Sequence, residues 1–127
     1  MSDSTDENLL IAGLQVTVSS ANDAAIVAAV GEVDMMTVSR LREALFGVLD
    51  ADTVPPLVAV DLREVGFLSS AGLGLLVDLA NTANAREVAL RIVAIPSPVL
   101  RAIEVTGLDT RFSVYNTLVE ALAAPHS

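Results

Sequence analysis

Residues 57–62, with the sequence LVAVDL, form a short and almost wholly apolar stretch that follows the break DTVPP. A strand with one face in water alternates apolar and polar residues, whereas an uninterrupted apolar run is typical of a strand that is covered on both faces. The stretch therefore predicts the central strand of a sheet, with other elements packed on both of its sides.

The residues before this strand predict a hairpin and a helix. Residues 14–20, LQVTVSS, alternate apolar and polar with a period of two, as a half-buried strand does. The turn AND separates them from the apolar run at 24–33, which should return as an antiparallel second strand. From Thr37 to about Asp50, apolar residues recur at helical spacing and predict an amphipathic helix.

The residues after the central strand predict further helices and strands in alternation. They are a helix from about Ser70 to Arg86, a strand at 88–94, a helix that begins after Ser97 and ends at Gly107, a strand at 112–115, and a last helix in which Thr117 and Glu120 have the spacing of a capping box. The order is ββαβαβαβα. This alternation predicts an α/β domain whose sheet is mainly parallel, with the opening hairpin as an antiparallel edge.

The length of 127 residues fits one domain with a single core. We expect a disordered acidic tail at 1–8, the domain at 9–124 and a flexible C-terminal tail at 125–127. No apolar run reaches the length of a membrane span, and the start MSDSTDEN is acidic and polar rather than basic and then apolar, as a secretory signal would be. The sequence thus predicts a cytoplasmic protein.

The amino-acid composition limits the kinds of site and partner that we expect. The chain has no cysteine, and its one histidine, His126, lies in a tail beside a proline, so we expect no metal site, no cofactor and no catalytic base. Asp61 and Glu64 are the nearest thing to a carboxylate pair, but Asp61 ends a strand and should bond backbone amides of the following turn. Sixteen acidic and seven basic residues give a net charge of −9, which disfavours nucleic acid as a partner. The same charge is explained equally by solubility and by a basic protein partner.

Two glycines at the start of the helix near Ser70 raise a question. Each glycine inside a helix costs about 1 kcal/mol relative to alanine, so Gly72 and Gly74 should serve a close approach. One explanation is tight packing of this helix against the sheet, and the other is a partner or a phosphate group placed against the exposed helix start. Ser69 and Ser70 come just before, where a serine caps a helix or, when phosphorylated, meets the positive end of the helix dipole.

Three segments of the chain resemble the STAS domain in its stand-alone form, the anti-sigma factor antagonist of bacterial partner-switching systems. VAVDLREVGFLSSAGLGLL resembles the central strand and switch helix of that family, GEVD at 31–34 resembles the loop after its second strand, and TGLDTRF at 106–112 resembles the turn before its last strand. The resemblance runs from about Leu14 to Ala123.

This resemblance implies a partner and a switch. The unphosphorylated protein would bind an anti-sigma factor of the serine-kinase type and free a sigma factor for transcription, and a phosphatase would reverse phosphorylation by that kinase. The acceptor in the best-known members directly precedes Gly-Leu-Gly, where this chain has Ala71, which lacks a hydroxyl group. Ser70 is the nearest substitute and Ser69 the next. The alternatives are a constitutive antagonist that is not phosphorylated, and a STAS module that senses a small ligand.

The expected partner-binding surface combines both loops. Asp34 and the residues after the third strand should lie at one end of the sheet, although Asp34 is explained equally well as a turn or capping residue of the first helix. Leu75 and Leu79 lie one helical turn apart and away from the expected core stripe, so they are either an exposed apolar contact or packed beneath the neighbouring helix. The whole predicted set is Asp34, Ser69, Ser70, Ala71, Gly72, Leu73, Gly74, Leu75 and Leu79.

Overall fold

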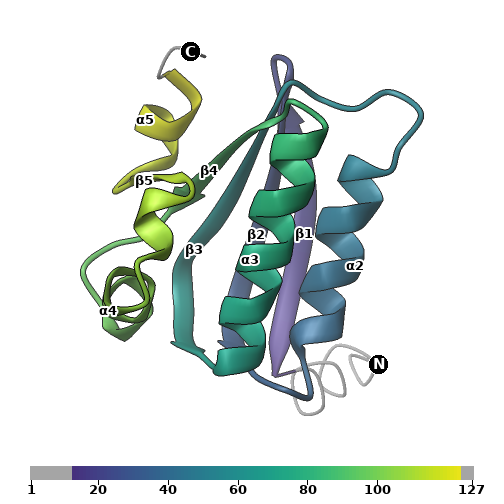
Figure 1. Ribbon diagram of the computed structural model, residues 1–127. Coiled ribbons are helices and arrows are strands. Elements are labelled where there is room, and N and C mark those ends of the chain that lie inside the picture. Colours follow the sequence, from purple (N-terminus) through teal and green to yellow (C-terminus); the bar gives the residue numbers. More distant parts are fainter. Residues whose placement is uncertain (1–12, 124–127) are drawn as a thin grey trace, which may run out of the picture.

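The computed structural model describes residues 13–123, which fold into one sheet with helices packed on it (Figure 1). The two expected tails and His126 lie outside the described residues. The five strands are β1 (Leu14–Ala21), β2 (Ala24–Val33), β3 (Leu57–Leu68), β4 (Ala89–Val93) and β5 (Ser113–Tyr115). The helices are α2 (Val38–Leu49), α3 (Ser70–Ala85), α4 (Pro98–Val105) and α5 (Leu118–Ala123), with a short 3-10 helix η1 (Leu108–Thr110).

The sheet has the order β1-β2-β3-β4-β5, so β3 is the central strand, as the sequence predicts. β1 pairs with β2 antiparallel through the turn at Asn22, whereas β2–β3, β3–β4 and β4–β5 are parallel. The α/β class and the order of the elements are therefore confirmed. β3 continues to Leu68, six residues beyond the predicted end at Leu62, because the long strand β2 goes on pairing with it as far as Val33 and Leu68.

The burial of β3 explains its apolar sequence. Successive side chains of a strand point to opposite faces of the sheet. On one face, Val58 and Val60 join the main core with α2 and α3, which run side by side over the sheet (Figure 1). On the other face, Leu57 and Ala59 pack against α5 in a smaller apolar cluster. Both faces of this strand are thus covered, so residues 57–60 are all apolar and do not alternate with polar residues.

Side-chain caps and a buried arginine fix the ends of the C-terminal elements. The hydroxyl of Ser97 accepts the backbone N–H of Leu100 at 3.3 Å, and that of Thr117 accepts the N–H of Glu120 at 3.1 Å, as predicted. Gly107 follows α4 with φ of +76°, a left-handed conformation that glycine adopts without strain. Arg91 of β4 is 4% exposed and donates to the carbonyl oxygen of Ala121 at 2.7 Å, which ties α5 to the sheet.

The two glycines of α3 lie in different surroundings. Gly72 is buried, and a Cβ atom on it would come within 2.5 Å of Leu68 Cδ1 and 2.9 Å of Val33 Cγ1. A Cβ atom on Gly74 would meet nothing within 4 Å. Gly72 is therefore explained by packing of α3 against the ends of β2 and β3, whereas packing gives no reason for Gly74.

Asp61 and Arg63 form an ion pair along β3. The Asp61 carboxylate accepts two bonds from the Arg63 guanidinium, at 2.7 and 2.9 Å, and also the backbone N–H of Arg63 at 3.1 Å. Burial raises the pKa of the Asp61 carboxyl, but the hydrogen bonds and the charge of Arg63 outweigh it, so the pKa lies below its ordinary value. The predicted backbone contact of Asp61 is present, but its expected position at the end of a strand before a turn is wrong, because β3 continues to Leu68 and the bonded amide belongs to Arg63 of the same strand.

We expect opposite effects from alanine at the two glycines. Gly72→Ala should lower the free energy of unfolding by about 1–3 kcal/mol, because the stiff and buried Val33 cannot yield to a new methyl group. Gly74→Ala should raise it by about 0.5–1 kcal/mol, since the site is open and alanine favours the helix. Urea unfolding followed by circular dichroism measures both values. Changes of the same sign in the two variants would contradict this division.

The Asp61 pair should contribute to acid sensitivity. A carboxyl whose pKa is lowered by folding stabilises the native state above its unfolded pKa, and this contribution is lost as pH falls through the folded pKa. Asp61→Asn should therefore be less stable than the wild type at pH 7, and the difference should shrink below about pH 4. Urea midpoints between pH 7 and pH 3 test this, with the exposed Asp109→Asn as control. A difference that is constant with pH would refute it.

Candidate functional site

The expected site residues meet at the end of the sheet where β2 and β3 stop and α2 and α3 begin. Because these strands are parallel, their C-terminal ends lie at the same edge (Figure 1). The backbone N–H of Ser69 donates to the carbonyl oxygen of Val33 at 2.9 Å, which joins the start of α3 to the end of β2. The structure thus brings the turn at Asp34 and the residues from Ser69 onward into one region, as predicted.

The two serines at the start of α3 have different roles. Ser69 is the N-cap: its backbone is extended, and its side chain accepts the N–H of Gly72 at 3.4 Å. Its hydroxyl group is half-buried and engaged in this cap. Ser70 is the first residue of the helix and is exposed. The first amides of a helix lack partners within it, and the helix dipole is positive there, so the surroundings of Ser70 favour negative charge.

The rest of the predicted segment is divided between surface and interior. Gly74 is exposed, whereas Ala71 and Leu73 are half-buried and Leu73 packs against the main core. Gly72 is covered by side chains of this chain. The exposed part of the α3 start therefore consists of Ser70 and Gly74, with Ala71 partly accessible.

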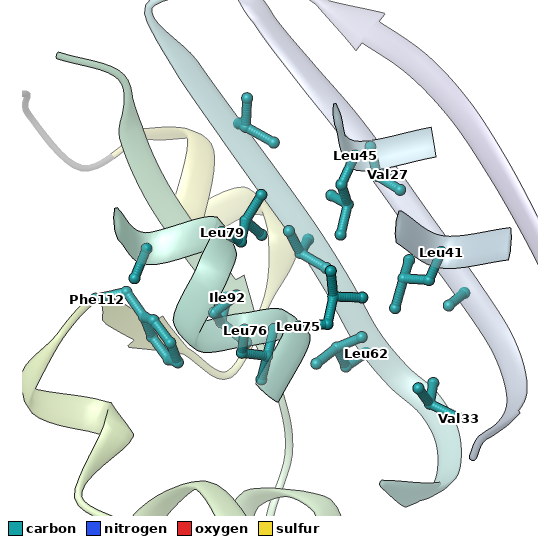
Figure 2. Close-up of a cluster of buried hydrophobic side chains, with 14 of the residues drawn as sticks. Val27, Val33, Leu41, Leu45, Leu62, Leu75, Leu76, Leu79, Ile92 and Phe112 are labelled. Atoms are coloured by element: carbon teal, nitrogen blue, oxygen red, sulfur yellow. The ribbon is translucent and has the colours of Figure 1, made fainter. Parts of the chain in front are cut away.

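Leu75 and Leu79 are not available to a partner. Both are fully buried, and Figure 2 shows them among the core side chains that include Leu41 and Leu45 of α2. The prediction of an exposed apolar pair is wrong, and the packing alternative is correct. The reason is that α2 lies beside α3 on the same face of the sheet, so this side of α3 faces the interior.

Asp34 organises a polar turn before α2. Its Oδ1 accepts the backbone N–H groups of Met36 and Thr37 at 2.9 and 3.0 Å, and its own N–H donates to Thr37 Oγ1 at 3.0 Å. The Thr37 hydroxyl donates to the carbonyl oxygen of Glu32 at 2.7 Å, and Thr37 is 6% exposed. The turn explanation of Asp34 is therefore sufficient for its side chain, and the same bonds fix the loop between β2 and α2.

The sequence analysis did not assign two residues of this turn to the site. Met35 and Met36 are 81% and 85% exposed, and they sit between the end of β2 and the start of α2. They could have been noticed in the sequence, because two large apolar residues stand together directly after GEVD and belong neither to the apolar pattern of the strand nor to that of the helix. Phe67 and Ile95 are also partly exposed, near the C-terminal ends of β3 and β4.

Two hollows of the described chain lie at another edge of the sheet. A depression of about 690 Å³ is lined by residues 109–115, and one of about 510 Å³ beside it is lined by residues that include Tyr115 and Glu120. Both follow the outer strand β5 and share no residue with the α3 start.

Comparison with known proteins gives the family. The sequence profile of the STAS domain matches residues 15–121. The anti-sigma-F factor antagonist RsfB of Mycobacterium tuberculosis is 36% identical over 109 residues, which are 86% of this chain and 87% of that protein. The anti-sigma-B factor antagonist of Listeria monocytogenes is 28% identical over 86 residues, which are 68% of this chain and 74% of that protein.

Solved structures agree with this assignment. The crystal structure of an anti-sigma factor antagonist from Mycobacterium paratuberculosis has a TM-score of 0.75 and 35% sequence identity, covering 86% of this chain and 91% of that one. The phosphorylated form of the Bacillus cell fate determinant SpoIIAA has a TM-score of 0.66 at 19% identity, covering 85% and 96%, and shows the fold alone. The chain therefore belongs to the STAS domain family, in which its relatives are named anti-sigma factor antagonists.

Proposed function

We propose that this protein is an anti-sigma factor antagonist in the cytoplasm that binds an anti-sigma factor of the serine-kinase type and thereby releases a sigma factor. The observation that carries the proposal is the 36% identity to RsfB over most of both chains. The exposed start of α3 supports it, because this region offers a surface to a partner at the place that the resemblance implies. We call Asp34, Met35, Met36, Ser70, Ala71 and Gly74 the docking surface.

Ser70 is the proposed phosphate acceptor. Its hydroxyl group is on an exposed residue at the first helical position, whereas that of Ser69 is engaged in the cap, and Ala71 has none. A kinase active site needs access to the oxygen that it modifies, which favours Ser70 over Ser69. The partner kinase would be the anti-sigma factor itself, and a phosphatase would restore the binding-competent form.

A phosphate on Ser70 would change the surface while the fold stays intact. The amides and the dipole at the start of α3 would stabilise its charge of about −1.5 to −2. The same charge would add to that of Glu32 and Asp34 at the end of β2, which the bond from Ser69 to Val33 joins to the start of α3, and would repel carboxylates or displace apolar groups of a docked partner. The switch would therefore act by electrostatics at the interface.

A small-ligand sensor is the second candidate. The hollows along β5 supply space for a ligand, but they are open surface depressions at the edge of the sheet. Binding sites for small molecules are usually concave, mostly apolar and able to bury most of the ligand. The names of the relatives and the exposed Ser70 favour a protein-binding switch over this candidate and over an enzyme.

Phosphorylation can be tested by mass. Incubation with ATP and the kinase-type anti-sigma factors encoded in the same genome should add one phosphate to the wild type and to Ser69→Ala, but none to Ser70→Ala. The reason is that only the Ser70 hydroxyl is both exposed and free of the cap. Intact-protein mass spectrometry gives the result. If Ser70→Ala still gains a phosphate, the acceptor is another residue. If the wild type gains no phosphate, the result favours the constitutive antagonist.

The electrostatic switch can be tested by mimicry. Ser70→Glu should weaken binding to the anti-sigma factor by about tenfold or more, because it places a negative charge on the docking surface. Ser20→Glu adds the same charge to an exposed serine of β1, toward the other end of the sheet, and should leave binding unchanged. Calorimetric titration measures both. Equal affinities of the two variants would exclude a charge-based switch at Ser70.

A further inference from the structure

The methionines of this chain have an unusual distribution. The sequence contains three, Met1, Met35 and Met36. The main core is built without methionine, from Leu, Val, Ile and Ala side chains together with Phe112. The two internal methionines are adjacent in sequence and are the two most exposed large apolar residues in the described part of the chain. Methionine is thus placed at one surface turn and is absent from the interior of residues 13–123.

The turn that carries them is fixed by polar contacts. Asp34 and Thr37, on either side of the pair, bond to each other and to the backbone of the loop, and the Thr37 hydroxyl is anchored to the carbonyl oxygen of Glu32. The backbone N–H of Met36 is itself held by Asp34 Oδ1 at 2.9 Å. These bonds hold the loop backbone in place while the methionine side chains project from it, so their exposure is built into the turn.

The pair lies beside the α3 start. Val33, two residues before Met35, accepts the N–H of Ser69, which directly precedes Ser70. Four of the eight exposed large apolar residues of the described chain, Met35, Met36, Phe67 and Ile95, lie at or just beyond the C-terminal ends of β2, β3 and β4. Scattered single apolar residues on a surface are normal, whereas a gathering at one end marks an interaction site.

We propose that Met35 and Met36 are the apolar anchor that enters a pocket of the anti-sigma partner, and that this pocket has an apolar floor and a basic rim. This inference rests on the proposed function and extends it. Methionine side chains are flexible and polarisable, so they adapt to an apolar pocket with little steric demand. The acidic Glu32 and Asp34 both precede the pair within three residues, and residues 31–37 contain no basic residue, which favours positive charge around the pocket.

The anchor and the phosphate would act as separate parts of one interface. Burial of two methionine side chains supplies affinity, because most of their apolar surface is in water before binding. Ser70, on the other side of the Val33–Ser69 contact, would supply the switch by its charge. Loss of the anchor should therefore weaken binding of the unphosphorylated protein and leave the stability of the domain unchanged.

The test compares matched variants in calorimetric titrations with the purified kinase-type anti-sigma factors of the same genome. The double variant Met35→Gln/Met36→Gln should bind at least tenfold more weakly than the wild type, and Met35→Leu/Met36→Leu should bind within about threefold of it. Val119→Gln changes a residue of α5 that is 76% exposed and should have no effect. Thermal unfolding of each variant checks that the fold is retained.

The outcomes separate the anchor from the proposed function. A wild type that binds while the glutamine variant binds equally well overturns the anchor alone. A wild type that binds none of these anti-sigma factors overturns the proposed function together with the anchor. Sedimentation of the free protein adds one case: a wild-type dimer that the glutamine variant does not form would assign the pair to self-association and overturn the partner assignment.

Oxidation gives a second, independent readout. Hydrogen peroxide transfers one oxygen atom to a thioether sulfur, giving a polar sulfoxide and water. The chain has no cysteine, so methionine is its only sulfur-containing residue. The protein is oxidised alone and freed of peroxide before the partner is added. Oxidised wild type should bind at least tenfold more weakly, whereas Met35→Leu/Met36→Leu treated in the same way should be unaffected. Full affinity of the oxidised wild type would overturn the anchor.

Discussion

The parallel pairing of β2 with β3 is the constraint on which the rest of the structure depends. It places the carboxyl ends of both strands at one edge of the sheet, so the loop after Val33 and the helix after Leu68 start together. The bond between Ser69 and Val33 then closes this junction at the level of the backbone. It also places β3 in the middle of the sheet, where helices cover both of its faces and demand an apolar sequence.

The start of α3 combines a structural and a surface requirement within three residues. Gly72 lets the helix approach Leu68 and Val33 more closely than a side chain would allow. Gly74 faces open space, so no side chain at this position covers the surface next to Ser70. The helix packs closely on the sheet at Gly72 and carries no side chain at Gly74. Ser70 is therefore exposed on a backbone that is held in place. In the proposed switch, a change of charge there would act on the partner while the domain remains folded.

The polar turn before α2 has a comparable division. The side chains of Asp34 and Thr37 satisfy the backbone of the loop, and Thr37 is itself buried. Apolar side chains at an exposed turn cost nothing to the fold when polar neighbours already hold the backbone. In this turn the residues that hold the backbone, Asp34 and Thr37, are polar and buried or half-buried, whereas the exposed residues Met35 and Met36 are apolar. This is the reverse of the usual arrangement of a surface loop.

The sequence by itself determined the class of the fold, the order of its elements and several of their ends. The apolar run at 57–62, the Ser97 cap and the stop at Gly107 each report a local requirement that residue types reveal directly. The tertiary structure decided which apolar side chains reach the surface. Helical spacing set Leu75 and Leu79 apart from the expected core stripe, but the position of α2 buries them, and the turn geometry turns Met35 and Met36 outward. Periodicity describes one element at a time, whereas burial depends on the neighbour that packs against it.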